Sequence, residues 1–181
     1  MKLFIGLLLS LSFFSGKAQS TFQDSLKQQL VKDWERAKAY TREYLEAMPA
    51  DKYGFRPVDS MRSFSQQMLH LAQANVYFTS IISGTKYSLG TQNLEKSPTA
   101  QTKDSVEYYV DASYDFAITA LKNMNAATLG EMITQNSPAG KRSETRLTWW
   151  LKAFEHQTHH RAQCTVYIRL VGLRPPAEKL F

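Results

Sequence analysis

Residues 149–176 read WWLKAFEHQTHHRAQCTVYIRLVGLRPP, and this stretch indicates how the chain folds. Apolar and histidine residues recur in it at steps of three or four, which is the spacing of one face of an α-helix. Gly172 and two prolines follow, and such residues end helices. We therefore predict a long helix that begins near Ser143, continues to Val171 and turns one face to a protein core. The residues predicted on that face are Trp149, Ala153, His156, His160, Cys164, Tyr167 and Val171.

Three earlier segments, at about 24–48, 60–82 and 102–124, show the same helical spacing. Four amphipathic helices of this length predict an all-α protein, a four-helix bundle in which each apolar stripe faces the common core. The predicted stripes are Leu26, Leu30, Trp34, Ala37, Tyr40, Tyr44 and Met48 in the first segment, Phe64, Met68, Leu71, Asn75, Phe78 and Ile82 in the second, and Val106, Tyr109, Ser113, Phe116, Ala120 and Met124 in the third.

The segments between the helices have the composition of turns and loops. Pro49 and Gly84 end the first and second helices, and Ser60 is a suitable N-cap for the second. The connections at 84–101 and 125–142 are rich in Gly, Ser, Thr, Pro and Asn, and loops of that length are usually functional or mobile. No stretch alternates with a period of two for long, so we expect long loops between the later helices and no substantial sheet.

The first 18 residues have the pattern of a secretory signal peptide. Lys2 supplies a positive charge, an apolar run follows at 3–14, and small residues precede Gln19, where we expect cleavage. The run is too short to cross a bilayer, which needs about 20 apolar residues, although an uncleaved anchor is the alternative interpretation. We therefore expect a single domain at 19–181, periplasmic or secreted, with no stable membrane anchor after cleavage.

The composition fits one globular domain with a packed core. The chain has 181 residues, of which 43% are hydrophobic. Its net charge of +6 would fall by two, to +4, with the loss of Lys2 and Lys17. An excess of this size does not indicate a nucleic-acid partner, and we expect none. Cys164 is the only cysteine, so no disulfide within the chain is possible and stability must come from packing, helped by any bound metal.

Three of the four histidines stand where they can share a metal ion. His156 and His160 are four residues apart on the predicted apolar face, a spacing that places two imidazoles near one ion. Burial and mutual repulsion would disfavour protonation of such a pair, and a shared cation relieves both. His70 lies at the edge of the buried face of the second helix, from where it can supply a third ligand. Three protein ligands leave coordination positions open, an arrangement more common in catalytic than in structural sites.

The alternative interpretation of each histidine is an ordinary hydrogen-bonded core residue. The spacing by itself leaves both interpretations open. His159 faces the flank of the helix, and we interpret it as a surface residue or as a residue that supports the ligands from outside.

Two stretches of the sequence resemble DinB-like proteins. One is Phe55-Arg56-Pro57 followed by SFSQQMLHL at 63–71, and the other runs from 154 to 176 and includes HQTHHRAQ at 156–163. The resemblance extends over the mature chain in helix order, while the third helix matches only in general character. It departs from the family at Ala162, where glycine is frequent.

The resemblance implies a DinB-like four-helix bundle in which His70, His156 and His160 fall on the family's three metal ligands. The metal it implies is a divalent cation, zinc or nickel first, although imidazoles also accept copper and iron. It further implies a fold related to metal-dependent thiol transferases and isomerases, and a homodimer. Export weakens the thiol-transferase interpretation, because low-molecular-weight thiols belong mostly to the cytoplasm.

The functional prediction has two forms. One is a metal-dependent hydrolase or transferase that acts on an unknown small molecule; the other is a non-catalytic, stress-related protein that binds a metal or small ligand. No residue stands out as a general base, and Glu155 points away from the histidines. Cys164 lies one turn beyond His160 on the same face. It can be interpreted as a core residue, an activated thiol or a fourth ligand. Arg161 and Gln163 are candidates for orienting the ligands, or for polar contacts between helices.

Overall fold

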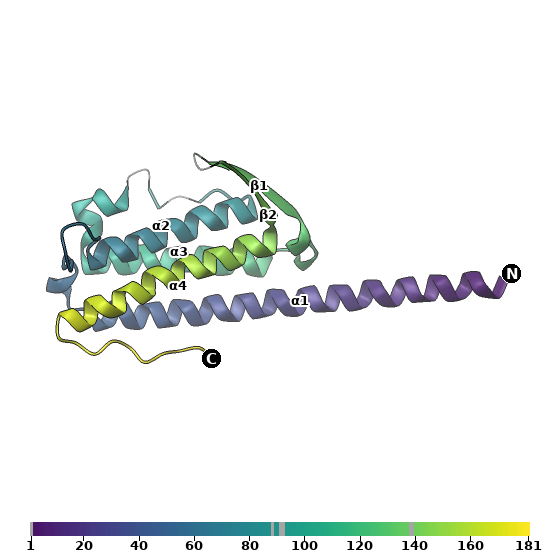
Figure 1. Ribbon diagram of the computed structural model, residues 1–181, viewed down its shortest axis with the longest axis horizontal. Coiled ribbons are helices and arrows are strands. Elements are labelled where there is room, and N and C mark those ends of the chain that lie inside the picture. Colours follow the sequence, from purple (N-terminus) through teal and green to yellow (C-terminus); the bar gives the residue numbers. More distant parts are fainter. Residues whose placement is uncertain (1, 88, 91–92, 138–139) are drawn as a thin grey trace.

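The computed structural model describes residues 2–87, 89–90, 93–137 and 140–181, with side chains from residue 22 onward except at position 137. It contains four α-helices: α1 (Lys2–Ala47), α2 (Phe64–Ser83), α3 (Lys103–Asn123) and α4 (Arg146–Leu170). Figure 1 shows them lengthwise beside one another, and the packed pairs are α1 with α3, α3 with α2, α2 with α4, and α4 with α1. The all-α four-helix bundle is therefore confirmed. The predicted signal peptide falls where no side chain is described, and it stays a prediction.

Short elements fill the connections between the helices. A 3-10 turn, η1 (Ala50–Lys52), follows α1, and η2 (Leu94–Lys96) and η3 (Pro98–Gln101) lie between α2 and α3. After α3 come η4 (Ala126–Gly130) and the antiparallel strands β1 (Met132–Ser137) and β2 (Gly140–Thr145). No helix within the described residues combines the length and the apolar character that a membrane crossing requires.

The hairpin of β1 and β2 corrects the expectation of a continuous loop between the third and fourth helices. Met132 pairs with Thr145 and Ser137 with Gly140. Period-two alternation does not reveal it, because the hairpin is mostly polar and covers the end of the bundle instead of forming a core layer. It is held there by Trp149, whose indole N–H donates to the Ile133 carbonyl at 3.3 Å.

Two helix starts differ from the sequence-based expectation. Ser63, not Ser60, caps α2, because its hydroxyl accepts from the Gln66 amide while the Gln66 side chain accepts from the Ser63 amide. Thr145 caps α4, which begins at Arg146, three residues after the predicted start near Ser143, because β2 continues to Thr145. At the other end of α2, Gly84 adopts the left-handed conformation (φ 71°) that favours glycine after a helix.

The core contains most of the predicted stripes, with α3 rotated. Trp34 is fully buried, and its ring lies 5.7 to 5.9 Å from those of Tyr114, Trp150 and Phe154. On α3 the predicted Tyr109, Phe116, Ala120 and Met124 are only partly buried, while Val110, Tyr114, Ala117 and Leu121 are fully buried. The helix packs between α1 and α2, so the middle of its buried face lies one position beyond the predicted stripe.

Candidate metal centre

The three histidines singled out in the sequence meet between α2 and α4. The ring centroids of His156 and His160 each lie within 5.3 Å of that of His70, and they lie 4.5 Å from each other. One ring nitrogen from each residue lies within 4.8 Å of the other two, and the group could hold a metal ion. Three atoms at that limit lie about 2.8 Å (4.8/√3) from a common point, against a Zn–N bond of about 2.0–2.1 Å. Side-chain rotation can close the difference.

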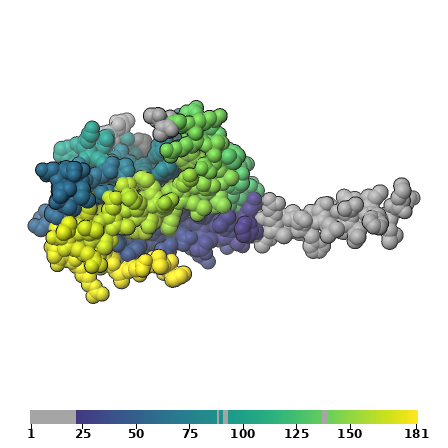
Figure 2. Space-filling view, viewed as in Figure 1, coloured from purple at the N-terminus to yellow at the C-terminus, as the bar shows by residue number. Residues whose placement is uncertain are grey.

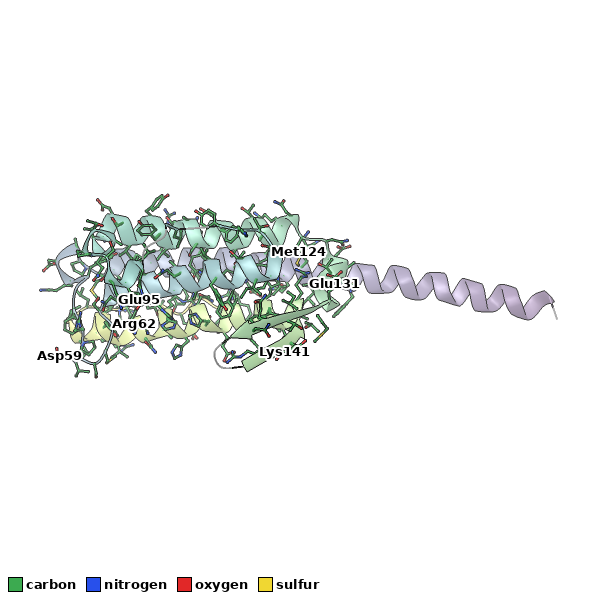
Figure 3. The ribbon with its side chains drawn as sticks, turned by 90° about the horizontal axis from the view of Figure 1, so that it is seen from above. Asp59, Arg62, Glu95, Met124, Glu131 and Lys141 are labelled. Carbon is green, nitrogen blue, oxygen red and sulfur yellow. The ribbon has the colours of Figure 1, made fainter. Side chains whose placement is uncertain are left out.

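His70 is oriented by a carboxylate from the connection between α2 and α3. Its Nδ1 lies 2.7 Å from Oε1 of Glu95, and the Arg62 Nε donates to Oε2 of the same carboxylate at 2.6 Å. Figure 3 shows Arg62 and Glu95 close together on one flank of the bundle. Burial would raise the pKa of Glu95, but hydrogen bonds from Arg62 and His70 outweigh it and lower the pKa. The ionised carboxylate holds a proton on Nδ1, so Nε2 of His70 keeps its lone pair for a ligand.

His160 is oriented in the same way by an amide. Its Nδ1 lies 2.8 Å from Oε1 of Gln67, a residue one turn before His70 on α2. The Gln67 side-chain nitrogen donates to Oε1 of Gln163 at 2.5 Å and to the Tyr167 hydroxyl at 3.3 Å, which determines which end of the amide faces the imidazole. Nε2 of His160 is therefore also the nitrogen left for a metal.

His156 completes the group without a hydrogen-bonded partner. Its Nδ1 is buried and accepts or donates no hydrogen bond within the described part of the chain. The Phe78 ring lies 5.6 Å from the imidazole. A buried imidazole nitrogen that pairs with nothing is costly, so the surroundings of this ring fit a residue whose polar partner is a cation.

The electrostatics keep the pair on α4 neutral. Burial, reinforced by the neighbouring imidazoles, lowers the pKa of His156 to about 4 and that of His160 to about 3. Both rings are therefore unprotonated at neutral pH. A metal ligand must be in this state, since the cation takes the lone pair that a proton would occupy.

These pKa values predict how the stability of the metal-free protein depends on pH. Because the folded pKa of each ring lies below the ordinary 6.5, the unfolded chain binds more protons as the pH falls. We expect the free energy of unfolding to keep its full value above about pH 6.5. At lower pH it should decrease, by up to about 1.4 kcal/mol per pH unit for each ring. Urea unfolding between pH 7.5 and 5.5 measures this slope. It should be shallower in His156→Gln/His160→Gln, and equal slopes would contradict the prediction.

The other residues weighed in the sequence lie outside the histidine group. Cys164 is fully buried, and burial raises the pKa of its thiol, so it is a core residue and not an activated thiol. Arg161 contacts α1 and Gln157 instead of the histidines. Glu155 is exposed, and so is His159, whose Nε2 lies 2.8 Å from the Gln163 amide nitrogen.

Sequence reasoning missed Glu95, Gln67 and Arg62, although Gln163, one of its candidates for orienting the ligands, does accept from the Gln67 amide that holds His160. Glu95 lies 25 positions from His70 in a connection without periodicity, and no local signal links the two. Gln67 and Arg62 lie within or just before α2, but their role depends on the position of α4. A polar cavity of about 690 Å³ adjoins these side chains and is lined by Arg62, Gln67, Glu95, Lys96 and Gln163, among others.

The fold and the site together define a four-helix bundle with a three-histidine group between two of its helices. The family model of the DinB family matches residues 19–180, and the chain therefore belongs to the DinB family. The family resemblance expected from the sequence is thus confirmed. A comparison with curated proteins gave no match.

Solved structures show the same fold. A DinB-like protein from Bacillus cereus ATCC 10987 is similar with a TM-score of 0.69 and 16% identity, over 84% of this chain and 97% of the other. A DinB-like protein from Bacillus subtilis has a TM-score of 0.63 and 18% identity, over 84% and 96%. A conserved protein from Enterococcus faecalis has a TM-score of 0.62 and 18% identity, over 80% and 95%.

Proposed function

We propose that the protein binds one divalent metal ion, zinc or nickel, through His70, His156 and His160, and that this centre serves hydrolysis or group transfer on a small molecule. The observation that carries the proposal is the convergence of three ring nitrogens from two helices. Two of the rings are held by Glu95 and Gln67 so that Nε2 is free, an arrangement typical of metal-ligating histidines.

Different residues of the chain would bind the ion and orient the substrate. Three imidazoles bind it and leave at least one position for a substrate or water. A bound divalent metal supplies Lewis acidity, the property with which metal hydrolases and transferases activate water or polarise a substrate. The cavity beside Arg62, Glu95 and Gln163 borders the side chains that orient the ligands and not the imidazoles themselves. It is large enough for a small molecule, and Lys96 and the amides in its lining supply a positive charge and hydrogen-bond donors to orient it.

A non-catalytic metal- or ligand-binding protein is the second candidate, and one observation favours it. Glu95 is the carboxylate that contacts the histidine group, and both of its oxygens are already engaged, one by His70 and the other by Arg62. A carboxylate tied in this way is a poor general base. If this candidate is correct, metal binds as proposed but no turnover follows.

Metal analysis followed by activity assays tests the proposal. Protein purified without added metal, and protein reloaded with zinc or nickel, should contain one equivalent per chain. Each form is then assayed against a panel of esters, amides, phosphoesters and thiol acceptors, beside metal-stripped protein. Turnover that requires the metal supports the enzyme. Full metal content without turnover favours the second candidate, and less than about 0.1 equivalent after reloading would overturn the metal site itself.

The support that Glu95 gives to His70 predicts a measurable loss of metal affinity in Glu95→Gln. The amide cannot attract the Nδ1 proton as a carboxylate does, so we expect affinity to fall about 10- to 100-fold while saturating metal still fills one site. Competition with a chromogenic chelator measures it. Glu144→Gln is the matched control, because Glu144 forms an ion pair with Lys152 on the hairpin side of the bundle. Equal affinities in the two variants would contradict the role of Glu95.

We also propose that the mature protein acts outside the cytoplasm, on the support of the signal-peptide pattern at 1–18. We expect protein expressed with its full sequence in a Gram-negative host to be recovered from the periplasm, with Gln19 as its first residue. Intact-mass measurement and N-terminal sequencing check this. Material that retains Met1 and stays with the membrane fraction would favour an uncleaved anchor.

A further inference from the structure

A second cavity lies on the other flank of α4, between α4, α1 and the C-terminal tail. Its volume is about 360 Å³, and it is lined by basic side chains from all three segments: Arg36, Arg161, Arg169 and Lys179. Figure 2 shows the tail, at the yellow end of the colour bar, lying against α1 beside α4. Arg36 holds the tail in place by donating to the Lys179 carbonyl at 2.7 Å.

Arg161 is a buried cation whose contacts are all neutral. The residue is only 5% exposed. Nη1 donates to Oε1 of Gln157 at 2.8 Å, and more weakly to the Thr41 hydroxyl at 3.3 Å and the Ala37 carbonyl at 3.4 Å. The guanidinium also lies over the Tyr40 ring, 4.7 Å from its centroid. All three of these hydrogen bonds come from the same nitrogen of the guanidinium.

No ionised group neutralises Arg161. It forms no ion pair within the part of the chain that the structure describes. Burial and the hydrogen bond with Tyr44 raise the pKa of Tyr40 to about 12, so this phenol stays neutral. Glu178 lines the cavity but is exposed and makes no ion pair either. A buried charge without a counter-ion is costly, and such groups are usually paired in folded proteins.

The remaining charges around the cavity do not change this balance. Two carboxylates beside its basic residues already form ion pairs. Asp33 pairs with Arg36 at 3.1 Å, and Glu43 pairs with Lys179. Arg169 is exposed at the rim and also has no ion-pair partner among the described residues. The cavity therefore has an excess of positive charge, with one largely buried guanidinium in its wall.

We propose that this cavity binds a small organic molecule carrying a carboxylate or phosphate group, at a site separate from the histidine group. The planar guanidinium of Arg161 matches an oxyanion through two parallel N–H bonds, and Arg36 and Arg169 add charge around it. The Tyr40 and Tyr44 rings and Pro175 and Pro176 offer an apolar wall for the body of the ligand. The volume falls at the small end of ligand-binding cavities.

Calorimetric titration of the full-length mature protein tests the site. Inorganic phosphate and benzoate are the probes, and sodium chloride keeps the ionic strength constant. The protein is first stripped of metal and freed of chelator, so that binding at the histidine group does not contribute. We expect one equivalent of at least one probe to bind. Preference for benzoate would identify a carboxylate ligand, and preference for phosphate a phosphate ester.

Three variants connect that binding to the cavity. Arg161→Met should weaken it at least about tenfold, since a charge-assisted hydrogen bond is lost, and Arg36→Gln should weaken it about three- to tenfold. Arg42→Gln is the matched control for Arg36→Gln. Arg42 is also on α1 and also pairs with an aspartate, Asp111, but it lies outside the cavity. Its affinity should stay within about twofold of the wild type.

The outcomes that overturn the proposal are specific. They are an absence of saturable binding to both probes, binding that appears only with metal present, or equal affinity in wild type and Arg36→Gln. Far-UV circular dichroism tests whether each variant is folded. If Arg161→Met does not fold, Arg36→Gln and Arg169→Gln, which change more exposed side chains, decide the question, and each should weaken binding about three- to tenfold.

Discussion

His160→Ala is expected to reduce the bound metal from one equivalent per chain to less than about a tenth, at metal concentrations that fill the wild-type site. His160 lies between the other two rings, with centroids 4.5 Å from each, and is the most buried of the three. Its loss leaves two ligands, and a site that has lost one of three imidazoles should weaken by more than the about 10- to 100-fold typical of a supporting residue. Elemental analysis after desalting measures the loss.

His159→Ala is the matched control for that experiment. It removes the same kind of side chain from the adjacent position of α4. His159 is exposed, and its ring lies edge-on 5.0 Å from that of His160, but its Nε2 pairs with the Gln163 side chain and it is not one of the three converging imidazoles. We expect this variant to keep a full equivalent. If His160→Ala also keeps a full equivalent, His160 is not a ligand, and the proposed three-histidine centre is wrong.

Trp34→Ala is expected to lower the free energy of unfolding by about 3–5 kcal/mol, the range for removing a fully buried large aromatic side chain. Trp34 is completely buried and makes edge-on contacts with Tyr114, Trp150 and Phe154, which come from α3 and α4. Truncation would leave a cavity where three helices meet. Since domains are stable by only about 5–15 kcal/mol, much of the stability would be lost.

Urea unfolding of metal-free protein, followed by far-UV circular dichroism, measures this loss. Phe22→Ala serves as the control, because Phe22 is an aromatic residue of the same helix that is 67% exposed. A surface substitution of this kind should change stability by less than about 0.5 kcal/mol. Comparable effects of the two substitutions would mean that the Trp34 cluster is not the centre of the core.

The helices and the pair on α4 could be predicted because both follow from local geometry. Residues three or four apart lie on one face of any α-helix, so the relation of His156 to His160 holds however the helix packs. The stripe that includes Trp34 and Tyr40 was correct for the same reason. The predicted start of α2 was wrong because two serines, Ser60 and Ser63, are both suitable N-caps. The reciprocal hydrogen bonds with Gln66 distinguish Ser63 from Ser60.

The buried face of α3 and the polar hairpin could not be predicted in the same way. A stripe identifies the middle of an apolar face, but α3 packs between two helices, and burial of Val110 and Tyr114 depends on how both neighbours approach. The hairpin has little apolar alternation, because its strands pair with each other at the end of the bundle. Its pairing depends on backbone hydrogen bonds, which leave no pattern in side-chain polarity.

The sequence by itself determined four helices, their order and the two imidazoles that face the same way on the last of them. The place of His70 at the edge of the buried face of the second helix made it a candidate third ligand, and the family resemblance strengthened that prediction. The meeting of His70 with the pair, and the contacts by which Glu95 and Gln67 hold the rings, were decided by the packing of α2 against α4 and of η2 against α2. That the Arg161 charge is buried without an ion-pair partner among the described residues likewise depends on the packing of α1 and the C-terminal tail around it. Along one helix the spacing of residues is set by 3.6 residues per turn, whereas a distance between helices depends on every side chain packed between them.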